Sequence, residues 1–340
     1  MIFRGGDVCA DCRFPMETYF GVLYCGDNYT LPYSLPQKYP FSSHWGASVT
    51  EMIMTGDDNL QFKTLEIAWL SLVEGEFYYL NIAINSAGEM TLCNSDEEGF
   101  PKLIVGLAPG GKSAIWFDYG SHSILYCWVK SKKIDIPMSD FLRNISSMTL
   151  TDYCKLTLQK CPKSLEYHST ELDTEKAKFD RIMCQYVYRI IISCENWDEN
   201  RWTKSDYIVE PVHIRCKMSD GTFDNRSYDR IAAYQKRATP LKIFFEMEFK
   251  KKSYEVFICF VDNQINDIYH RFLRNHPETK TDFIIRIDAE NKKYELALYR
   301  QGLKEPVVIP ESAYQLIVFK NKFEDYRSEN YNQPRGAWIW

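Results

Sequence analysis

Residues 102–130 read KLIVGLAPGGKSAIWFDYGSHSILYCWVK, and how this stretch folds decides the architecture of the chain. Before and after its glycine-rich centre, the residues are mostly β-branched, aliphatic or aromatic, which predicts strands. Pro109, Gly110 and Gly111 suit a tight turn between two of these strands. Gly120 marks a second turn. The stretch therefore predicts strand, turn, strand, turn, strand, which is the pattern of an antiparallel sheet.

The same stretch contains a literal match to the phosphate-loop pattern G-x-x-x-x-G-K-S. Its fixed positions are Gly106, Gly111, Lys112 and Ser113, so these are the candidate nucleotide-binding residues. A phosphate loop must open into a helix whose N-terminus faces the anion. The residues after Ser113 indicate a strand instead, and we therefore disfavour nucleotide binding.

An internal repeat supports this interpretation. Residues 65–78 align without a gap on residues 241–254, each a strand, a short charged turn and a second strand. Further along, 101–105 correspond to 281–285. The turn equivalent to the glycine-rich one, residues 288–293, contains no glycine. A feature that one copy replaces with acidic and basic residues is expected to shape a turn rather than to bind phosphate.

The repeat and the strand patterns predict a β-rich α+β fold. We expect two similar antiparallel-sheet units with one or two short helices each: residues 1–150, a linker with a helical segment at 151–180, and residues 181–340. The clearest helix is predicted at 264–275, where apolar residues follow a single helical stripe. A third match, 136–141 over 309–314, closes the two copies.

Composition excludes several classes of protein. The 340 residues are 45% hydrophobic and 26% charged, so the chain is neither disordered nor fibrous. No apolar run is long enough for a transmembrane helix. The net charge of −5 gives no general attraction for nucleic acid. Residues 1–150 carry 10 basic and 17 acidic side chains, a net charge of −7, which leaves +2 for the rest.

The residues that usually carry chemistry form no recognisable constellation. The 11 cysteines include one close pair, Cys9 and Cys12, for which we predict no strand before and no helix after, so a redox role is not expected. The six histidines lack metal-ligand spacing. No nucleophile motif is present. We predict no catalytic residues, no metal and no cofactor.

The last residues, YNQPRGAWIW, are unusually aromatic. One interpretation is a final strand that docks on the body of the protein. The alternative is a contact patch for a partner protein, carried by Tyr331, Arg335, Trp338 and Trp340, since such side chains dominate interfaces energetically.

The first half resembles the bacterial domain-of-unknown-function family 2931. The resemblance covers roughly residues 10–145 and rests on Phe14, Pro15 and Gly21, on Trp45-Gly46, on the strand pair with Leu65, Ile67, Trp69, Phe77 and Tyr78, and on the GLAPGG turn before Ile115-Trp116. Members of that family are typically small envelope proteins, many with lipoprotein leaders, and no activity carries over. The resemblance implies an envelope or periplasmic lipoprotein location. The first residues lack the apolar core of a signal peptide, which predicts a cytoplasmic protein or a start that misses a leader.

These observations together favour a non-enzymatic binding protein of the bacterial envelope type. One form is an immunity-like protein that occludes a partner protein. The alternatives are a hydrolase or carbohydrate-acting enzyme with a site between the repeats, and a structural envelope component.

Overall fold

The structure is a computed structural model. It describes residues 2–4, 6–11, 13–25, 29–32, 45–46, 53–55, 62–84, 101–142, 148–160, 172–194, 211, 213–249, 252–288, 293–300, 303 and 305–320. The chain divides into two compact units, Met1–Asp180 and Arg181–Trp340. Each unit is described by itself.

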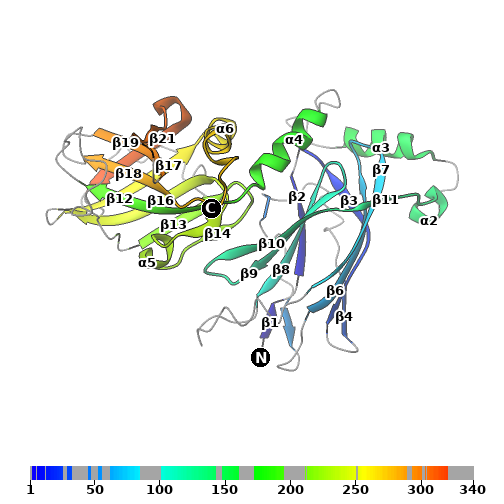
Figure 1. The fold of residues 1–340 in the computed structure, drawn as a ribbon. Coiled ribbons are helices and arrows are strands. Elements are labelled where there is room, and N and C mark those ends of the chain that lie inside the picture. Colours follow the sequence, from blue (N-terminus) through cyan, green and yellow to red (C-terminus); the bar gives the residue numbers. More distant parts are fainter. Residues whose placement is uncertain are drawn as a thin grey trace, which may run out of the picture. The chain divides into compact units, whose positions relative to one another are not determined.

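The first unit is built mainly from strands (Figure 1). Its elements are β1 (Ile2–Arg4), β2 (Gly6–Ala10), β3 (Met16–Cys25), β4 (Tyr29–Pro32), β5 (Ile53–Thr55), β6 (Phe62–Ser71), β7 (Glu76–Ala83), β8 (Lys102–Ala108), β9 (Lys112–Asp118), β10 (Ser123–Lys130), β11 (Lys132–Ile134), α2 (Met138–Leu142), α3 (Leu150–Gln159) and α4 (Leu172–Ile182), whose last two residues belong to the second unit. Its larger sheets have the orders β10-β9-β8-β2 and β11-β7-β6-β3-β4, and β1 pairs with β5.

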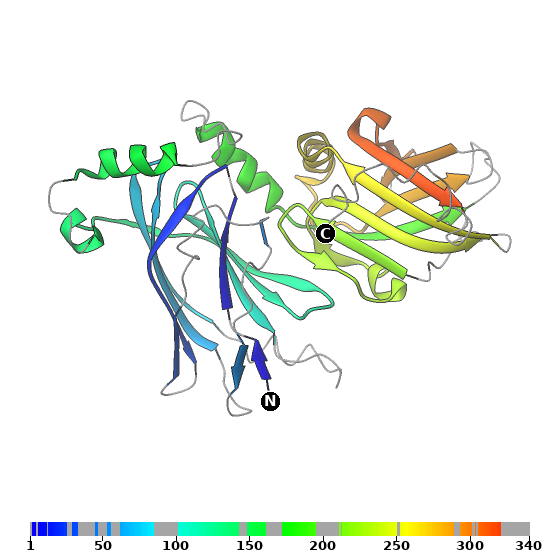
Figure 2. The ribbon, with the colours of Figure 1, turned by 180° about the vertical axis from the view of Figure 1, so that it is seen from behind.

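Helices α2 and α3 cover one end of the five-stranded sheet of the first unit. Both ribbon views place α3 where β6 turns into β7 (Figures 1 and 2). Cys154 of α3 is buried with Leu70, Leu72 and Phe77 of the sheet, and Phe141 of α2 packs against the same cluster. The helices therefore shield this end of the sheet on the face that points away from the other sheet, which we call the outer face.

The described strands of the second unit form two five-stranded sheets. Its elements are β12 (Tyr186–Cys194), β13 (His213–Met218), β14 (Phe223–Asp224), α5 (Tyr228–Ile231), β15 (Gln235–Arg237), β16 (Pro240–Phe249), β17 (Lys252–Phe260), α6 (Asp262–Leu273), β18 (Thr281–Asp288), β19 (Lys293–Arg300), β20 (Val307–Val308), η3 (Glu311–Ala313) and β21 (Tyr314–Lys320). The sheet orders are β15-β12-β18-β19-β20 and β14-β13-β16-β17-β21.

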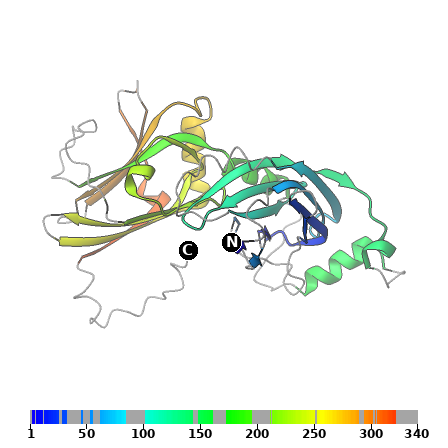
Figure 3. The ribbon, with the colours of Figure 1, turned by 90° about the horizontal axis from the view of Figure 1, so that it is seen from below.

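A single apolar core holds the second unit together. In β17, alternate side chains from Tyr254 to Phe260 are buried, which is the period-two pattern of a strand with one face in the core. Tyr188 of β12 and Phe245 of β16 come from different sheets, and both are buried in that core. Figure 3 shows α6 between the sheets, and Tyr269 of α6 is fully buried there.

The β-rich character predicted from the sequence is confirmed, with two differences in detail. First, each unit contains one parallel strand pair, β2 beside β8 and β12 beside β18, so the sheets are not purely antiparallel. Period-two patterns show where strands lie but not in which direction neighbours run. Second, the prediction that no strand lies before the pair Cys9 and Cys12 was wrong, because β2 begins at Gly6 and runs through the buried Cys9.

A buried carboxyl in the second unit predicts how its stability depends on pH. Asp220 is fully buried and accepts hydrogen bonds from the Thr222 amide (3.0 Å), the Thr222 hydroxyl (2.6 Å) and Gln185 Nε2 (2.9 Å). Burial raises the pKa of Asp220 above its ordinary value, although these hydrogen bonds oppose the shift. The stability that this group contributes is therefore fully present below its unfolded pKa and is lost as the pH rises through the folded pKa.

Replacing Asp220 by asparagine should remove that dependence. In urea unfolding experiments between pH 4 and pH 7, we expect the stability of Asp220→Asn, relative to the parent protein, to improve as the pH rises above the ordinary pKa of the carboxyl. The control is Glu278→Gln, whose side chain is 67% exposed. A stability difference for Asp220→Asn that stays constant across this range would contradict the prediction.

Candidate functional site

The glycine-rich turn at residues 106–113 is a β-hairpin. Ala108 of β8 pairs with Lys112 of β9, which leaves Pro109, Gly110 and Gly111 as a three-residue turn. Gly110 and Gly111 have φ of 76° and 66°, a region that favours glycine. The predicted hairpin is therefore present, and a strand rather than a helix follows the turn.

The backbone amide of Gly110 in this turn already donates hydrogen bonds to a carboxylate from another hairpin. The Gly110 N–H donates to both oxygens of Glu74, at 3.1 and 2.9 Å. Glu74 also accepts from the Ser71 hydroxyl at 2.8 Å and pairs with Lys176 Nζ of α4 at 3.0 Å. Its side chain is only 4% exposed. The anion at this turn is thus supplied by the protein itself.

The other residues of the phosphate-loop pattern have partners within the same unit. Lys112 pairs with Asp180 and lies 6.0 Å from the centre of the Trp128 ring. The Ser113 hydroxyl is buried, 3.2 Å from the Ser131 hydroxyl. A Cβ on Gly106 would lie 2.4 Å from the Trp116 ring, so close packing accounts for this glycine.

The remaining predictions about sites concern other parts of the chain. The proposed contact residues Tyr331, Arg335, Trp338 and Trp340 lie outside the described residues. Within the part of the chain that is described, no group of three or more His, Cys, Asp or Glu side chains is placed to hold a metal ion. Among the described helices, none combines the length and apolar character needed to cross a bilayer.

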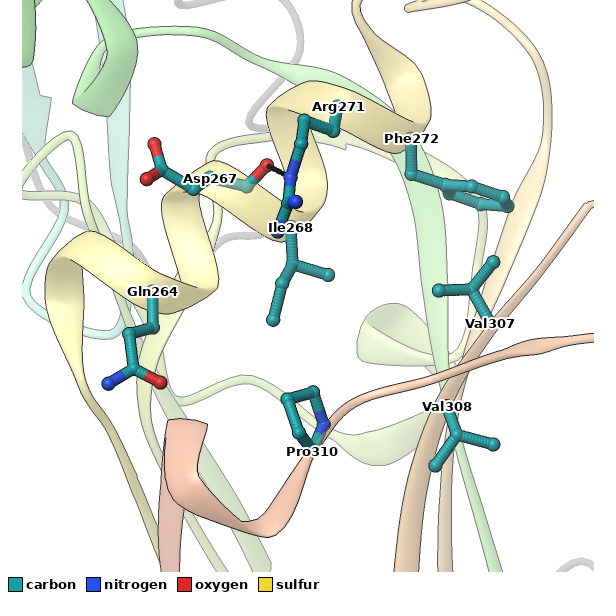
Figure 4. A pocket seen from close by; sticks show the side chains of 8 residues that line it. All are labelled: Gln264, Asp267, Ile268, Arg271, Phe272, Val307, Val308 and Pro310. Carbon is teal, nitrogen blue, oxygen red and sulfur yellow. Dashed lines mark hydrogen bonds between the residues drawn. The ribbon is translucent and has the colours of Figure 1, made fainter.

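A groove of about 530 Å³ lies between α6 and β20 of the second unit. Figure 4 shows Ile268 and Phe272 of α6 facing Val307 and Val308 across it, with Pro310 at one end. The charged groups at its rim are engaged locally. Asp267 pairs with Arg181 at 2.5 Å, and Arg271 Nε donates to the Asp267 carbonyl. The groove is an apolar depression with no acid–base pair among its lining residues.

A more distinctive site lies on the outer face of the five-stranded sheet of the first unit, beside the part that α2 and α3 cover. We call it the outer-face patch and define it by five side chains from three neighbouring strands: Phe20 and Tyr24 of β3, Glu66 of β6, and Tyr79 and Asn81 of β7. Phe20 and Tyr24 are each 37% exposed.

Strand register arranges the patch in rows. Phe20 and Tyr79 flank Ala68 on opposite sides, with ring centroids 6.2 Å apart. In the next row, Asn81 lies directly opposite Glu66. A bulge in β3 between Thr18 and Phe20 turns Phe20 onto this face. Bulges commonly re-aim a side chain in this way next to functional sites.

Hydrogen bonds fix the polar centre of the patch. Asn81 Nδ2 donates to Glu66 Oε1 at 2.8 Å, and the Tyr24 hydroxyl donates to Glu66 Oε2 at 3.3 Å. Asn81 Nδ2 also donates to the Tyr79 hydroxyl at 3.3 Å. The Glu66 carboxylate raises the pKa of Tyr24, because ionising this tyrosine would place two negative charges side by side.

Sequence reasoning missed this patch. It assigned the strand tyrosines and phenylalanines to core packing, which is their usual role. The outward direction of Phe20 depends on the bulge, and the grouping depends on register between strands about 40 residues apart in the chain. The available signal was the alternation in residues 76–83, where Tyr79 and Asn81 fall opposite to the apolar phase.

Comparison with known protein families gives a match, and it lies in the first unit. Residues 40–165 match the model of a family described as protein of unknown function (DUF2931). The family model therefore covers part of the first unit of the chain. The DUF2931 match includes the hairpin turn at 106–113 and Glu66, Tyr79 and Asn81 of the outer-face patch, whereas Phe20 and Tyr24 precede it. No curated protein matches the chain. No solved structure matches it either.

Proposed function

We propose that this protein is a non-enzymatic binding protein, and that the outer-face patch holds its partner protein. The observation that carries the proposal is the patch itself, in which Phe20, Tyr24 and Tyr79 surround a hydrogen-bonded polar centre. Exposed aromatic side chains beside fixed polar groups are typical of interface anchors. The glycine-rich turn, by contrast, is engaged by Glu74 of its own unit.

The setting that we propose for this binding is the bacterial envelope. Its support is the DUF2931 match over residues 40–165, since the resemblance found in the sequence is to proteins of envelope type. In this setting the protein acts in an immunity-like way, by occluding a partner protein.

Removing the aromatic rings of the patch should abolish partner capture without unfolding the protein. We expect the double variant Phe20→Ala/Tyr79→Ala to lose at least about tenfold of the enrichment of one specific protein, because interface anchors of this kind are worth 2 kcal/mol or more each. The measurement is quantitative mass spectrometry of proteins captured by full-length bait from the native cells.

The matched control is Phe319→Ala, which removes a 48% exposed phenylalanine from β21 of the second unit. Circular dichroism should show all three baits folded. If no protein separates the double variant from both the parent and the control, the proposed function is wrong.

The two alternative functions, a hydrolase or carbohydrate-acting enzyme and a structural envelope component, stay predictions. An enzyme would need converging acid–base groups. The two described carboxyls whose pKa is raised, Glu17 and Asp220, lie in different units, and burial is the main cause for each. A structural envelope component would give no single captured partner in the experiment above.

We also propose that the two units arose by tandem duplication. The orders β10-β9-β8-β2 and β20-β19-β18-β12 correspond position by position, as do β11-β7-β6-β3-β4 and β21-β17-β16-β13-β14. The parallel pairs β2–β8 and β12–β18 occupy the same position in each. The aligned segments 136–141 and 309–314 each contain a short helical turn, α2 and η3. The matching edge strands differ in their order along the chain, because β11 precedes α2 whereas β21 follows η3. Superposition of the units in an experimental structure tests this proposal.

A further inference from the structure

The Glu66 carboxylate at the centre of the outer-face patch lacks a cationic partner in the described part of the chain. Its hydrogen bonds come from Tyr24 and Asn81, which are both neutral. A carboxylate offers about four acceptor positions, so each Glu66 oxygen retains one. Asn81 Oδ1 likewise accepts no hydrogen bond from any described residue. The three oxygens, Glu66 Oε1, Glu66 Oε2 and Asn81 Oδ1, therefore each keep at least one acceptor position that no described donor fills.

Aromatic rings lie on both sides of these acceptors. Rows along a strand are about 7 Å apart, and neighbouring strands are about 4.8 Å apart. The Phe20–Tyr79 row therefore lies one step from Glu66 in one direction, and Tyr24 lies one step away in the other. A cation bound to Glu66 would therefore lie about one row from aromatic rings on both sides, close to the range of roughly 6 Å over which a ring attracts positive charge.

The second unit contains a similar group of a carboxylate and a tyrosine, and there an arginine of the same unit is bound to it. Arg189 Nε donates to Asp282 at 2.7 Å, and the guanidinium carbon lies 4.7 Å from the centre of the Tyr234 ring. The Tyr234 hydroxyl donates to the same carboxylate at 2.6 Å. Carboxylate, tyrosine hydroxyl and stacked guanidinium thus form one triad. The outer-face patch has the first two components of this triad, in Glu66 and Tyr24.

The net charge of this part of the chain also favours a cationic group at the site. Residues 1–150, which contain the whole patch, carry a net charge of −7. Among the described strands of this sheet, register places the nearest lysine on this face at Lys132, opposite Tyr79 and two strands away from Glu66. The site is therefore acidic at its centre, and a basic group would be attracted there.

We infer that the outer-face patch binds an arginine side chain of the partner protein, with its guanidinium on Glu66 and Asn81 and between the Phe20–Tyr79 row and Tyr24. The inference rests on the proposed function and specifies the chemistry of its partner. Arginine fits better than lysine, because its planar fork matches a carboxylate and stacks on aromatic rings.

Short peptides test this inference on the full-length protein. The probes are three fluorescein-labelled hexapeptides with the pattern Ser-X-Gly-Ser-X-Gly, in which X is arginine, lysine or glutamine. We expect the arginine peptide to bind most tightly, measured by fluorescence anisotropy. Glu66→Gln, which keeps the shape and removes the charge, should weaken it about tenfold, the size expected for one charged hydrogen bond.

The control is Glu76→Gln, which removes another carboxylate of the same sheet, one that already pairs with Lys133 at 2.6 Å. It should leave the arginine peptide unaffected. Equal loss in both variants, or equal binding of the arginine and lysine peptides, would mean general acidic attraction and would overturn the inference.

Partner capture separates this inference from the proposed function. If Glu66→Gln still captures the partner while Phe20→Ala/Tyr79→Ala does not, the patch is the interface but arginine recognition is wrong. If both variants capture it fully, the proposed function fails as well. Loss in both, together with the peptide result, supports the inference.

Discussion

Replacing Gly111 by alanine should lower the free energy of unfolding of the first unit by about 3 kcal/mol. Two costs add. An alanine at φ of 66° costs about 1 kcal/mol, because its Cβ crowds the backbone there. In addition, the new Cβ would lie 2.3 Å from Cδ1 of the buried Tyr78 ring, and such overpacking adds about 1–3 kcal/mol. Chemical denaturation of the full chain measures the loss.

Gly75 provides the matched control. It also lies in a hairpin turn, between β6 and β7, with φ of 65°, but a Cβ there meets no atom within 4 Å. Gly75→Ala should therefore cost only about 1 kcal/mol. Equal losses in the two variants would show that backbone strain alone explains the glycine, and that the contact with Tyr78 is unimportant.

The contrast between these glycines shows what the sequence can predict. That residues 109–111 form a turn followed from Pro109, two glycines and the flanking strand patterns. The three strands within residues 102–130, β8, β9 and β10, were predicted in their observed order, because period two and β-branched residues are local signals. Helix α6 followed in the same way from its apolar stripe.

Contacts between distant segments could not be predicted in this way. The ring of Tyr78 against Gly111 and the carboxylate of Glu74 on Gly110 join two hairpins through a sequence separation of more than 30 residues. The outer-face patch needs both a strand register and a bulge. A single sequence contains no direct signal for the register or the bulge, because its hydrophobic pattern indicates only which face of a strand is buried.

The second large effect concerns the carboxylate that holds the two hairpins together. Glu74→Ala should lower the free energy of unfolding by about 3 kcal/mol, because removing one partner of a buried ion pair leaves the rest uncompensated. The Gly110 N–H and the Ser71 hydroxyl would lose their acceptor, and Lys176 would lose its counterion. Lys176 is 28% exposed and can reach water, which limits the loss.

Glu76 is the control that isolates burial from charge. It lies two residues away, and its ion pair with Lys133 is 2.6 Å long, but the side chains are 34% and 60% exposed. Exposed pairs contribute about 0–1 kcal/mol, so Glu76→Ala should change the free energy of unfolding by less than 1 kcal/mol. Glu74→Gln should fall between the two, because the amide oxygen still accepts from Gly110 while the attraction to Lys176 is lost. If Glu74→Ala were as mild as Glu76→Ala, water would be replacing the carboxylate, and the turn amide would be available to an external anion.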